Sequence, residues 1–385
     1  RSNMLLDRIL GAQVNIIPGL PEETEAQTEE RCHQLGLEHA ARLEAQGHRC
    51  YDVPMGGASP VGSAAFIGGY LELEEPAGQE YYPDLCGVNL GRTALLWLME
   101  ARKCRKIYLP FFLCDSVTGA CERSGAEIEF YHMDEGLHPV FEERTLSEGE
   151  YLYLVNYYGQ LTDDKIRKYK KIYGNIIVDH THAFFQKPLP GVDTLYSCRK
   201  FLGVSDGAYL STDAELEPEK KPLDHSMGRM EHILGRYEYD AGTFYQKMLD
   251  NAANYHEMEI RRMSRLTGNL LRTMDYSGIK TRREKNYRLL AQLLPSRNAF
   301  TGEVPEGPFA YPYYHKNGLE LRHWLAGRKI FVPTNWRNIL EEFDRDTMEY
   351  DWAANVLPLP CDQRYGAEEM QYIADSIREW EETES

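Results

Sequence analysis

Short apolar runs alternate with longer amphipathic segments along the chain from about residue 88 onward. Most of the apolar runs show no alternation between apolar and polar positions, which predicts strands buried on both faces. The main examples are KIYLPFF (106–112), EYLYLV (150–155) and IIVD (176–179). The segments between them, such as GRTALLWLMEA (91–101), VTGACERSG (117–125) and TDDKIRKYKKIYG (162–174), predict helices. This order predicts an α/β fold whose mainly parallel sheet is covered on both faces.

The pattern changes after this region. Residues 214–224 are charged and contain prolines, which is typical of an exit from a sheet domain, and residues 228–298 are charged and helical. The remainder mixes predicted strands with predicted helices and indicates a small α+β domain. The strands are FAYPYYH (309–315), KIFVPTNW (329–336) and NVLPLP (355–360), and the helices are LELRHWLAG (319–327) and AEEMQYIADSIREW (367–380). We therefore expect three parts, at 1–68, 69–227 and 228–385.

Charge and cysteine content narrow the class of function. The 385-residue chain has a formal net charge of −17, which disfavours nucleic acid or an anionic membrane as a partner. No apolar run reaches the roughly 18–20 residues of a membrane helix, and the first residues do not resemble a signal peptide. The eight cysteines show no C-x-x-C spacing, so we expect reduced thiols and no metal site. These features favour a cytoplasmic protein that acts on small molecules.

Two turns at predicted strand ends are candidate ligand sites, because open α/β sheets bind ligands at that edge. NLGRTAL (89–95) places a glycine turn at a helix start, where free N–H groups and the helix dipole attract phosphate. The same turn is also typical of an ordinary helix N-cap. VNYYGQ (155–160) places Asn156 and Tyr157 at another strand end, where the alternative is a simple turn.

Asp179 and Lys200 carry the strongest chemical signal. Asp179 ends an apolar strand, where an unpaired carboxylate is costly, so it either caps the next turn or faces a cation such as a pyridinium nitrogen. Lys200, between two apolar segments, either extends to solvent or has a lowered pKa that allows a Schiff base. A phosphate turn, then a strand-end aspartate, then Ser-x-x-Lys (197–200) is an order that chance rarely produces. The order favours a lysine that forms a Schiff base over a solvated lysine.

Residues from about 66 to the C-terminus resemble the fold type I enzymes that use pyridoxal 5'-phosphate (PLP). Among these enzymes, they are most similar to the DegT-like sugar aminotransferase group. The matching segments are IGGYLELE, NLGRTALL, IYLPFFLCDSV, VNYYGQ, IIVDHTHAFF, YSCRKFLGVSDGAYL, GPFAYPYYHKNG and LPLPCDQRY. The resemblance implies a large PLP-binding domain with a sheet of the seven-stranded type, a small α+β C-terminal domain, and a homodimer. It also implies an amino donor and a carbonyl acceptor, such as a keto sugar or a small keto acid.

The resemblance further implies roles for individual residues. Lys200 would form the internal aldimine, Asp179 would keep the ring nitrogen of PLP protonated, and His182 would position the ring. Phosphate contacts would come from Gly91, Arg92, Thr93 and Ser197. Phe112 or its neighbour Phe111 would stack on the ring, and Asn156 would approach the ring oxygen or the substrate.

Two departures keep other functions open. The family's FSxxKxxxxGEGG is here YSCRKFLGVSDGA, so the glycine-rich end is altered, and a protein that binds PLP without catalysis is one alternative. The family's substrate-side features are not recognisable, and Arg364 would either receive a substrate carboxylate or lie on the surface.

The first 68 residues resemble a fragment of fold type II enzymes, D-cysteine desulfhydrase and 1-aminocyclopropane-1-carboxylate deaminase. Neither the PLP lysine nor the phosphate loop of those enzymes is present, so we expect no chemistry from this fragment itself. A PLP-dependent lyase or deaminase is the second alternative.

Overall fold

The computed structural model describes residues 80–239, 242–294, 298 and 303–384, together with isolated positions between 24 and 45. The chain divides into two compact units, Arg1–Pro76 and Ala77–Ser385. The expectations for residues 1–68, including the fold type II resemblance, lie outside the described residues. All the described strands belong to the second unit.

A mixed sheet of eight strands forms the centre of this unit, in the order β1-β8-β7-β6-β5-β2-β3-β4. Strands β7, β6, β5, β2 and β3 are parallel, whereas β8 is antiparallel to both of its neighbours and β4 is antiparallel to β3. The bounds are β1 (Cys86–Val88), β2 (Lys106–Pro110), β3 (Glu127–Met133), β4 (Pro139–Val140), β5 (Glu150–Val155), β6 (Ile176–Asp179), β7 (Asp193–Ser197) and β8 (Ala208–Ser211). The predicted α/β fold with a mainly parallel sheet is confirmed, with the short edge strand β4 in addition.

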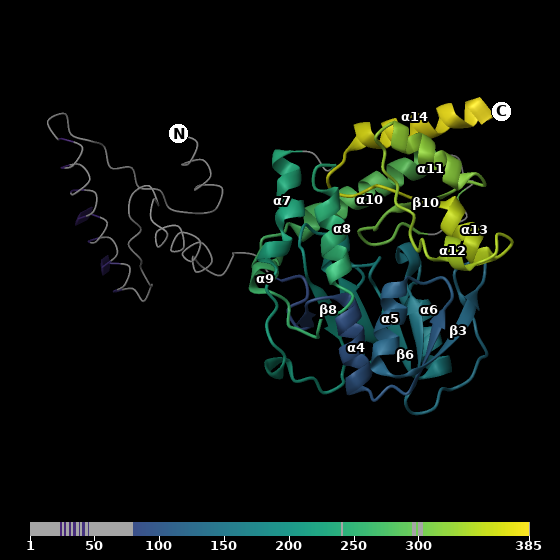
Figure 1. The fold of residues 1–385 in the computed structure, drawn as a ribbon, viewed down its shortest axis with the longest axis horizontal. Helices are drawn as coiled ribbons and strands as arrows, with labels where there is room; N and C mark the ends of the chain where they lie inside the picture. Colours follow the sequence, from purple (N-terminus) through teal and green to yellow (C-terminus); the bar gives the residue numbers. More distant parts are fainter. Residues whose placement is uncertain are drawn as a thin grey trace. The chain divides into compact units, whose positions relative to one another are not determined.

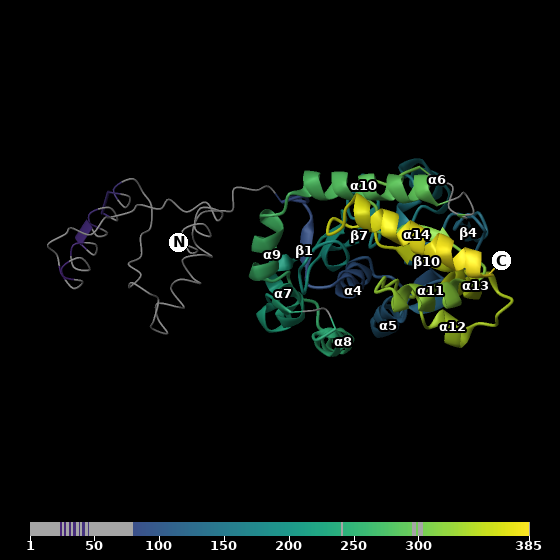
Figure 2. The same ribbon diagram turned by 90° about the horizontal axis from the view of Figure 1, so that it is seen from above.

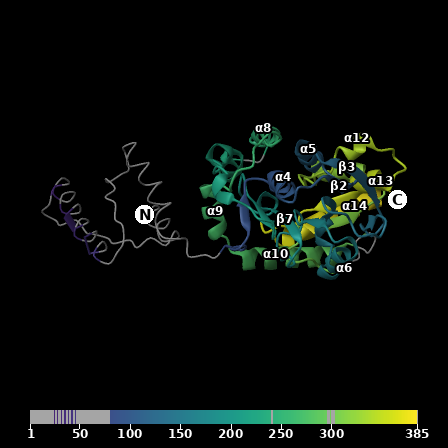
Figure 3. The same cartoon turned by 90° about the horizontal axis from the view of Figure 1, so that it is seen from below.

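Helices cover both faces of the sheet, as Figures 1 and 3 show. Helices α4 (Gly91–Ala101) and α5 (Asp115–Ser124) pack on one face, and α6 (Asp163–Tyr173) packs on the other. Each face of the sheet packs against its helices in a separate hydrophobic core, and successive side chains of β5 alternate between the two. Tyr151 and Tyr153 lie in the core with α4, and Leu152 and Leu154 lie in the core with α6. Both faces are therefore apolar, which explains the continuous apolar runs in the sequence.

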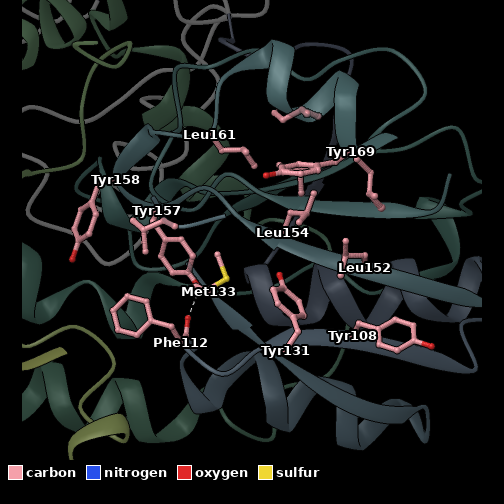
Figure 4. Packing of buried hydrophobic residues seen from close by; sticks show 14 of the residues in the cluster. Tyr108, Phe112, Tyr131, Met133, Leu152, Leu154, Tyr157, Tyr158, Leu161 and Tyr169 are labelled. Carbon is pink, nitrogen blue, oxygen red and sulfur yellow. Dashed lines mark hydrogen bonds between the residues drawn. The ribbon is translucent and has the colours of Figure 1, made fainter. Parts of the chain in front are cut away.

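The core on the α6 side is rich in tyrosines (Figure 4). Tyr108, Tyr131 and Tyr157 are each at most 3% exposed. Their hydroxyl groups accept or donate hydrogen bonds, as buried phenols require: Tyr131 donates to the Tyr153 carbonyl at 2.6 Å, and Tyr157 donates to the Phe112 carbonyl. The core on this side is consequently fixed by directional bonds as well as by packing.

The C-terminal elements form a second core beyond the sheet (Figure 1). Strands β9 (Tyr311–Tyr314) and β10 (Val356–Leu359) pair antiparallel, and the long helices α10 and α14 pack against each other, side by side in Figure 2. The helices are α7 (Glu231–Glu238), α8 (Tyr245–Asn254), α9 (Arg265–Arg272), α10 (Tyr276–Leu293), α11 (Gly318–Gly327), α12 (Ile339–Glu342), α13 (Met348–Asn355) and α14 (Ala367–Glu384). This arrangement agrees with the predicted α+β character of the tail.

The strand predicted over residues 329–336 was wrong. The segment starts and ends in turns and does not pair with another described strand. Ile330 and Val332 are buried and Lys329, Phe331 and Pro333 are exposed, so the burial alternates as it does in a strand. Pro333 lacks an amide donor, and Trp336 has a φ of 53°, which turns the chain.

The altered glycine-rich segment GVSDGA (203–208) links two turns by hydrogen bonds: the turn before α4, which contains Asn89, and the turn after β7, which contains Cys198. The Gly207 amide donates to the Asn89 carbonyl at 2.6 Å, and the Gly207 carbonyl accepts from the Cys198 amide at 3.1 Å. Gly207 has a φ of +112°, and a Cβ there would lie 2.9 Å from the methyl carbon of Thr267. Only glycine meets both conditions without strain.

The neighbouring Asp206 fixes this joint to α9. Its carboxylate is fully buried and accepts from the backbone amide and the hydroxyl of Ser264, each at 2.8 Å, and from the hydroxyl of Thr267. Ser264 is in turn the N-cap of α9. The segment GVSDGA thus forms a structural joint in this chain through Asp206 and Gly207.

Gly207→Ala is expected to lower the free energy of unfolding by about 1–3 kcal/mol, because alanine must adopt a positive φ and displace Thr267. Gly119→Ala is the matched control, since Gly119 lies within α5 and a Cβ there meets nothing within 4 Å. That change should leave stability equal or higher by up to about 1 kcal/mol. Urea unfolding measures both variants, and equal midpoints for Gly207→Ala and the wild type would contradict the proposed joint.

Candidate active site

A pocket of about 240 Å³ lies at the carboxyl ends of β6 and β7, in front of the N-terminus of α4. Six of the residues predicted from the sequence line it: Gly91, Arg92, Asp179, His182, Ser197 and Lys200. They come from three segments that are distant along the chain. The parallel strands bring Asp179 and Ser197 to one edge, and the Gly207 joint brings the turn before α4 to the turn after β7.

Asp179 is 7% exposed at the end of β6. The Tyr153 hydroxyl donates to its Oδ2 at 2.8 Å, the Thr181 amide donates to its Oδ1 at 2.7 Å, and the Thr181 hydroxyl donates to the same oxygen. Burial, followed by the nearby carboxylate, raises the pKa of Tyr153 well above its ordinary value, so this phenol stays a donor. The sequence suggested that Asp179 either caps the next turn or faces a cation. In the structure the carboxylate caps the following turn and also lines the pocket.

Lys200 follows β7 in the short 3₁₀ turn η2 (Cys198–Lys200). Its side chain is exposed where it lines the pocket, and protein atoms surround it elsewhere. Burial lowers the pKa of Lys200, while the charges of Cys114 and Asp179 oppose that shift and the charge of Arg199 adds to it. The pocket therefore favours a neutral, nucleophilic amine more than water does.

His182 is almost completely buried, and its ring stacks on Phe309 with centroids 4.1 Å apart and planes 11° from parallel. Burial, and then the charge of Lys200, lower the pKa of His182 well below its ordinary value, so the imidazole is neutral. Its Nδ1 has no hydrogen-bond partner among the described residues. A buried nitrogen of this kind is costly unless a ligand or water reaches it.

The other end of the pocket suits an anion. The amides of Gly91 and Arg92 precede the first intrahelical bond, from the Ala94 amide to the Leu90 carbonyl at 2.9 Å. A Cβ on Gly91 would meet nothing within 4 Å, so the space in front of the helix is open. Burial lowers the pKa of Arg92, whose guanidinium forms no hydrogen bond or ion pair with any described residue. The Ser197 hydroxyl also faces the pocket.

Thr93 and Asn156 do not line the pocket, although the sequence pointed to both. The Thr93 hydroxyl is buried, donates to Asn89 at 2.6 Å and accepts from the Leu90 amide at 3.2 Å, which caps α4. Asn156 accepts from the Leu161 amide at 2.8 Å and donates to Gln186 at 2.7 Å. The side chains of Thr93 and Asn156 stabilise their own turns. Because neither residue lines the pocket, the geometry does not support direct contacts between them and a cofactor.

Neither predicted stacking aromatic lines the pocket. Phe112 is buried behind it, with its ring centroid 4.4 Å from that of Trp336, and Phe111 stacks on Phe130 at 5.1 Å. Trp336 is instead an aromatic side chain that lines the pocket. Arg364 pairs with Asp362 at 2.7 Å and does not line the pocket either. A substrate carboxylate therefore has no support at Arg364.

Sequence reasoning missed several residues of the site, among them Tyr153, Thr181, Arg199, Cys114 and Trp336, and only some of them left a signal. Tyr153 could have been found, because register places it and Asp179 on the same face of adjacent strands. Arg199 lies next to Lys200 in the same turn, and Cys114 is the N-cap residue of α5. Trp336 comes from the segment mistaken for a strand, so no local pattern pointed to it.

Within the part of the chain that the structure describes, two kinds of feature are absent. There is no cluster of three or more His, Cys, Asp or Glu side chains that could hold a metal ion. No described helix has the length and hydropathy needed to cross a bilayer. The cysteines at 86, 104, 114, 121, 198 and 361 are free thiols, as predicted.

Comparison with solved structures identifies the fold. DesV of S. venezuelae, solved in complex with a ketimine intermediate, has a TM-score of 0.55 and 18% identity, covering 94% of this chain and 99% of DesV. The sugar aminotransferase CalS13 of Micromonospora echinospora has a TM-score of 0.53 and 13% identity, covering 84% and 92%. E. coli GDP-4-keto-6-deoxy-D-mannose-3-dehydratase, solved with bound hydrated PLP, has a TM-score of 0.53 and 13% identity, covering 85% and 99%.

These structures share the α/β fold of PLP fold type I, and the fold expected from the DegT-like resemblance is confirmed. At 18% identity or less, the likeness establishes the fold alone. No protein-family model matches the sequence, and no curated protein matches it.

In the protein without cofactor, acetylation of Lys200 is expected to reach half of its maximal rate below pH 10.5, the ordinary lysine pKa, because burial disfavours the ammonium form. Asp179→Asn should lower the midpoint further, since the aspartate charge raises the pKa of Lys200. Pulse labelling with peptide mass mapping measures both. A wild-type midpoint at or above 10.5 would refute the lowered pKa of Lys200, and an upward shift in Asp179→Asn would refute the role of the charge.

Proposed function

We propose that this protein is a PLP-dependent aminotransferase-like enzyme in which Lys200 binds the cofactor covalently. The observation that carries the proposal is that a lysine with a lowered pKa, a buried strand-end aspartate and a helix N-terminus line one pocket. The sequence order alone suggested this set, and the fold is one on which such chemistry occurs in its structural neighbours.

The residues present fit PLP at both ends of the pocket. The open space at Gly91, the helix amides, the Arg92 guanidinium and the Ser197 hydroxyl suit its phosphate. The unpartnered Nδ1 of His182 suits a polar atom on the ring. Asp179 receives three hydrogen bonds, and since a carboxylate offers about four lone-pair sites, it can accept one more from the ring nitrogen.

PLP, when bound, supplies an electron sink for the bonds at the amine-bearing carbon of the substrate. The side chains of this chain then divide the remaining work. Asp179 holds a proton at the ring nitrogen, with Tyr153 and Thr181 fixing its orientation. The Lys200 amine would serve as general base and acid, taking a proton from the donor carbon and returning it. Trp336 and the stacked His182–Phe309 pair limit access of water.

The substrates are proposed from the resemblance and from the neighbours. CalS13 is a sugar aminotransferase, and a keto sugar is accordingly one proposed acceptor, with a small keto acid as the other. We also propose a cytoplasmic homodimer. The lyase or deaminase alternative depends on the N-terminal fragment, which lies outside the described residues, and no described residue favours it.

Borohydride reduction after addition of PLP is expected to label Lys200, because its amine lines the pocket and burial lowers its pKa. Peptide mass mapping locates the label. Lys200→Ala should lose it, whereas Lys187→Ala should keep it, because the Lys187 ammonium donates to the Tyr81 carbonyl outside the pocket. Protein that never gains the cofactor absorbance, or label spread over surface lysines, would end the proposal.

Asp179→Asn is expected to slow the reaction with any amine donor by about 100-fold or more, since an amide cannot keep the ring nitrogen protonated. The change in cofactor absorbance on mixing with a donor panel measures the rate. A wild-type protein that reacts only when a keto acceptor regenerates the cofactor is an aminotransferase. Release of ammonia without an acceptor would indicate a lyase, and bound PLP without reaction with any donor would indicate a binding protein.

A further inference from the structure

Among the described residues, Arg199 is the one charged residue lining the pocket whose position the proposed function leaves unused. It lies between Cys198 and Lys200 in the turn η2, and its guanidinium carbon is 4.1 Å from the ring centroid of Tyr255. Tyr255 is 1% exposed, and its hydroxyl donates to the Ser205 carbonyl at 2.8 Å. A rigid, buried aromatic platform therefore holds the arginine plane in one orientation beside the pocket.

The guanidinium of Arg199 has no hydrogen bond or ion pair with any described residue, and the same holds for Arg92. The nearest acids do not neutralise them. The carboxylate oxygens of Asp206 accept hydrogen bonds from Ser264 and Thr267. Asp115 is exposed in the first turn of α5. The two unpaired guanidinium groups line one pocket, where the charge of Arg199 disfavours the charged form of Arg92, so an anion bound between them would relieve this repulsion.

The surroundings of the pair point to the kind of anion. The free amides at the start of α4, the open space at Gly91 and the Ser197 hydroxyl line the same pocket. The buried Nδ1 of His182, which also lines the pocket, has no hydrogen-bond partner among the described residues and so points to a ligand there. Guanidinium groups bind phosphate through paired, charge-assisted hydrogen bonds, and a phosphate dianion balances two positive charges.

We propose that Arg199, seated on Tyr255, pairs with Arg92 to clamp the phosphate of the cofactor as a dianion. The clamp makes the pocket select phosphorylated pyridoxal over pyridoxal itself. This inference rests on the proposed function for the identity of the ligand, but it concerns phosphate binding and not the covalent bond to Lys200.

The test compares the affinities for PLP and pyridoxal in a Lys200→Ala background, so that the covalent bond does not contribute. Arg199→Gln is expected to weaken PLP binding by about 10- to 100-fold, the usual effect of losing charge-assisted hydrogen bonds, and to leave pyridoxal binding unchanged. Arg123→Gln is the matched control, because it removes a nearby positive charge whose guanidinium donates to the His256 and Met258 carbonyls outside the pocket. It should alter neither affinity by more than about threefold.

Inorganic phosphate provides the second measurement. It should raise the melting temperature of the cofactor-free protein, compete with PLP, and lose both effects in Arg199→Gln. Phosphate that binds without competing with PLP would place the clamp on a substrate phosphate and overturn the assignment to the cofactor.

An unchanged ratio of PLP to pyridoxal affinity in Arg199→Gln would overturn the proposal. If circular dichroism shows that this variant is unfolded, Arg199→Lys is tested in its place. Lysine keeps the positive charge but lacks the planar guanidinium group that binds phosphate through two hydrogen bonds. Equal PLP affinity in Arg199→Lys and in the Lys200→Ala parent would then refute the clamp. Failure of the proposed function would be distinct, because it would appear as absent borohydride labelling at Lys200.

Discussion

The site depends on one backbone joint, in which Gly207 donates to the Asn89 carbonyl and accepts from the Cys198 amide. Asn89 leads directly into the turn with Gly91 and Arg92, and Cys198 begins the turn that ends in Lys200. The two bonds therefore hold the turn at the start of α4 and the lysine of the pocket in a fixed relation. Because Gly207 has a backbone conformation that other residues rarely adopt, this relation requires glycine at that position.

The parallel sheet supplies the other half of the geometry. Strands β6 and β7 end at the same edge, so Asp179 and Ser197 meet there although they are distant in sequence. A buried carboxylate at that edge is tolerated because Tyr153, on the neighbouring strand β5, and Thr181, in the following turn, donate to it. The polar groups of the site thus depend on the register of the sheet as much as on the local sequence.

The fold, and the residues that line the main part of the pocket, could be predicted from the sequence because both depend on local signals. Continuous apolar runs indicated the buried strands, and strand ends indicated Gly91, Asp179 and Lys200. Thr93 and Asn156 had the same kind of signal, but their side chains satisfy backbone groups of their own turns, which competes with ligand binding. A sequence pattern does not distinguish these two uses of a polar side chain.

The aromatic wall could not be predicted, for a different reason. Whether Phe111, Phe112 or neither faces the pocket depends on how the chain leaves β2, and packing places Phe112 in the core with Tyr157. Trp336 reaches the pocket through a turn with positive φ in the C-terminal part, which propensity disfavours and tertiary packing imposes. Arg199 was overlooked because its neighbour Lys200 explained the motif.

A crystal structure of the protein grown with PLP tests the central claim most directly. We expect continuous density from the Lys200 Nζ into a single ring, with the Asp179 carboxylate at hydrogen-bonding distance from the ring nitrogen and the phosphate before α4. A ring bound elsewhere, or Asp179 and Lys200 in contact with different molecules, would contradict the claim.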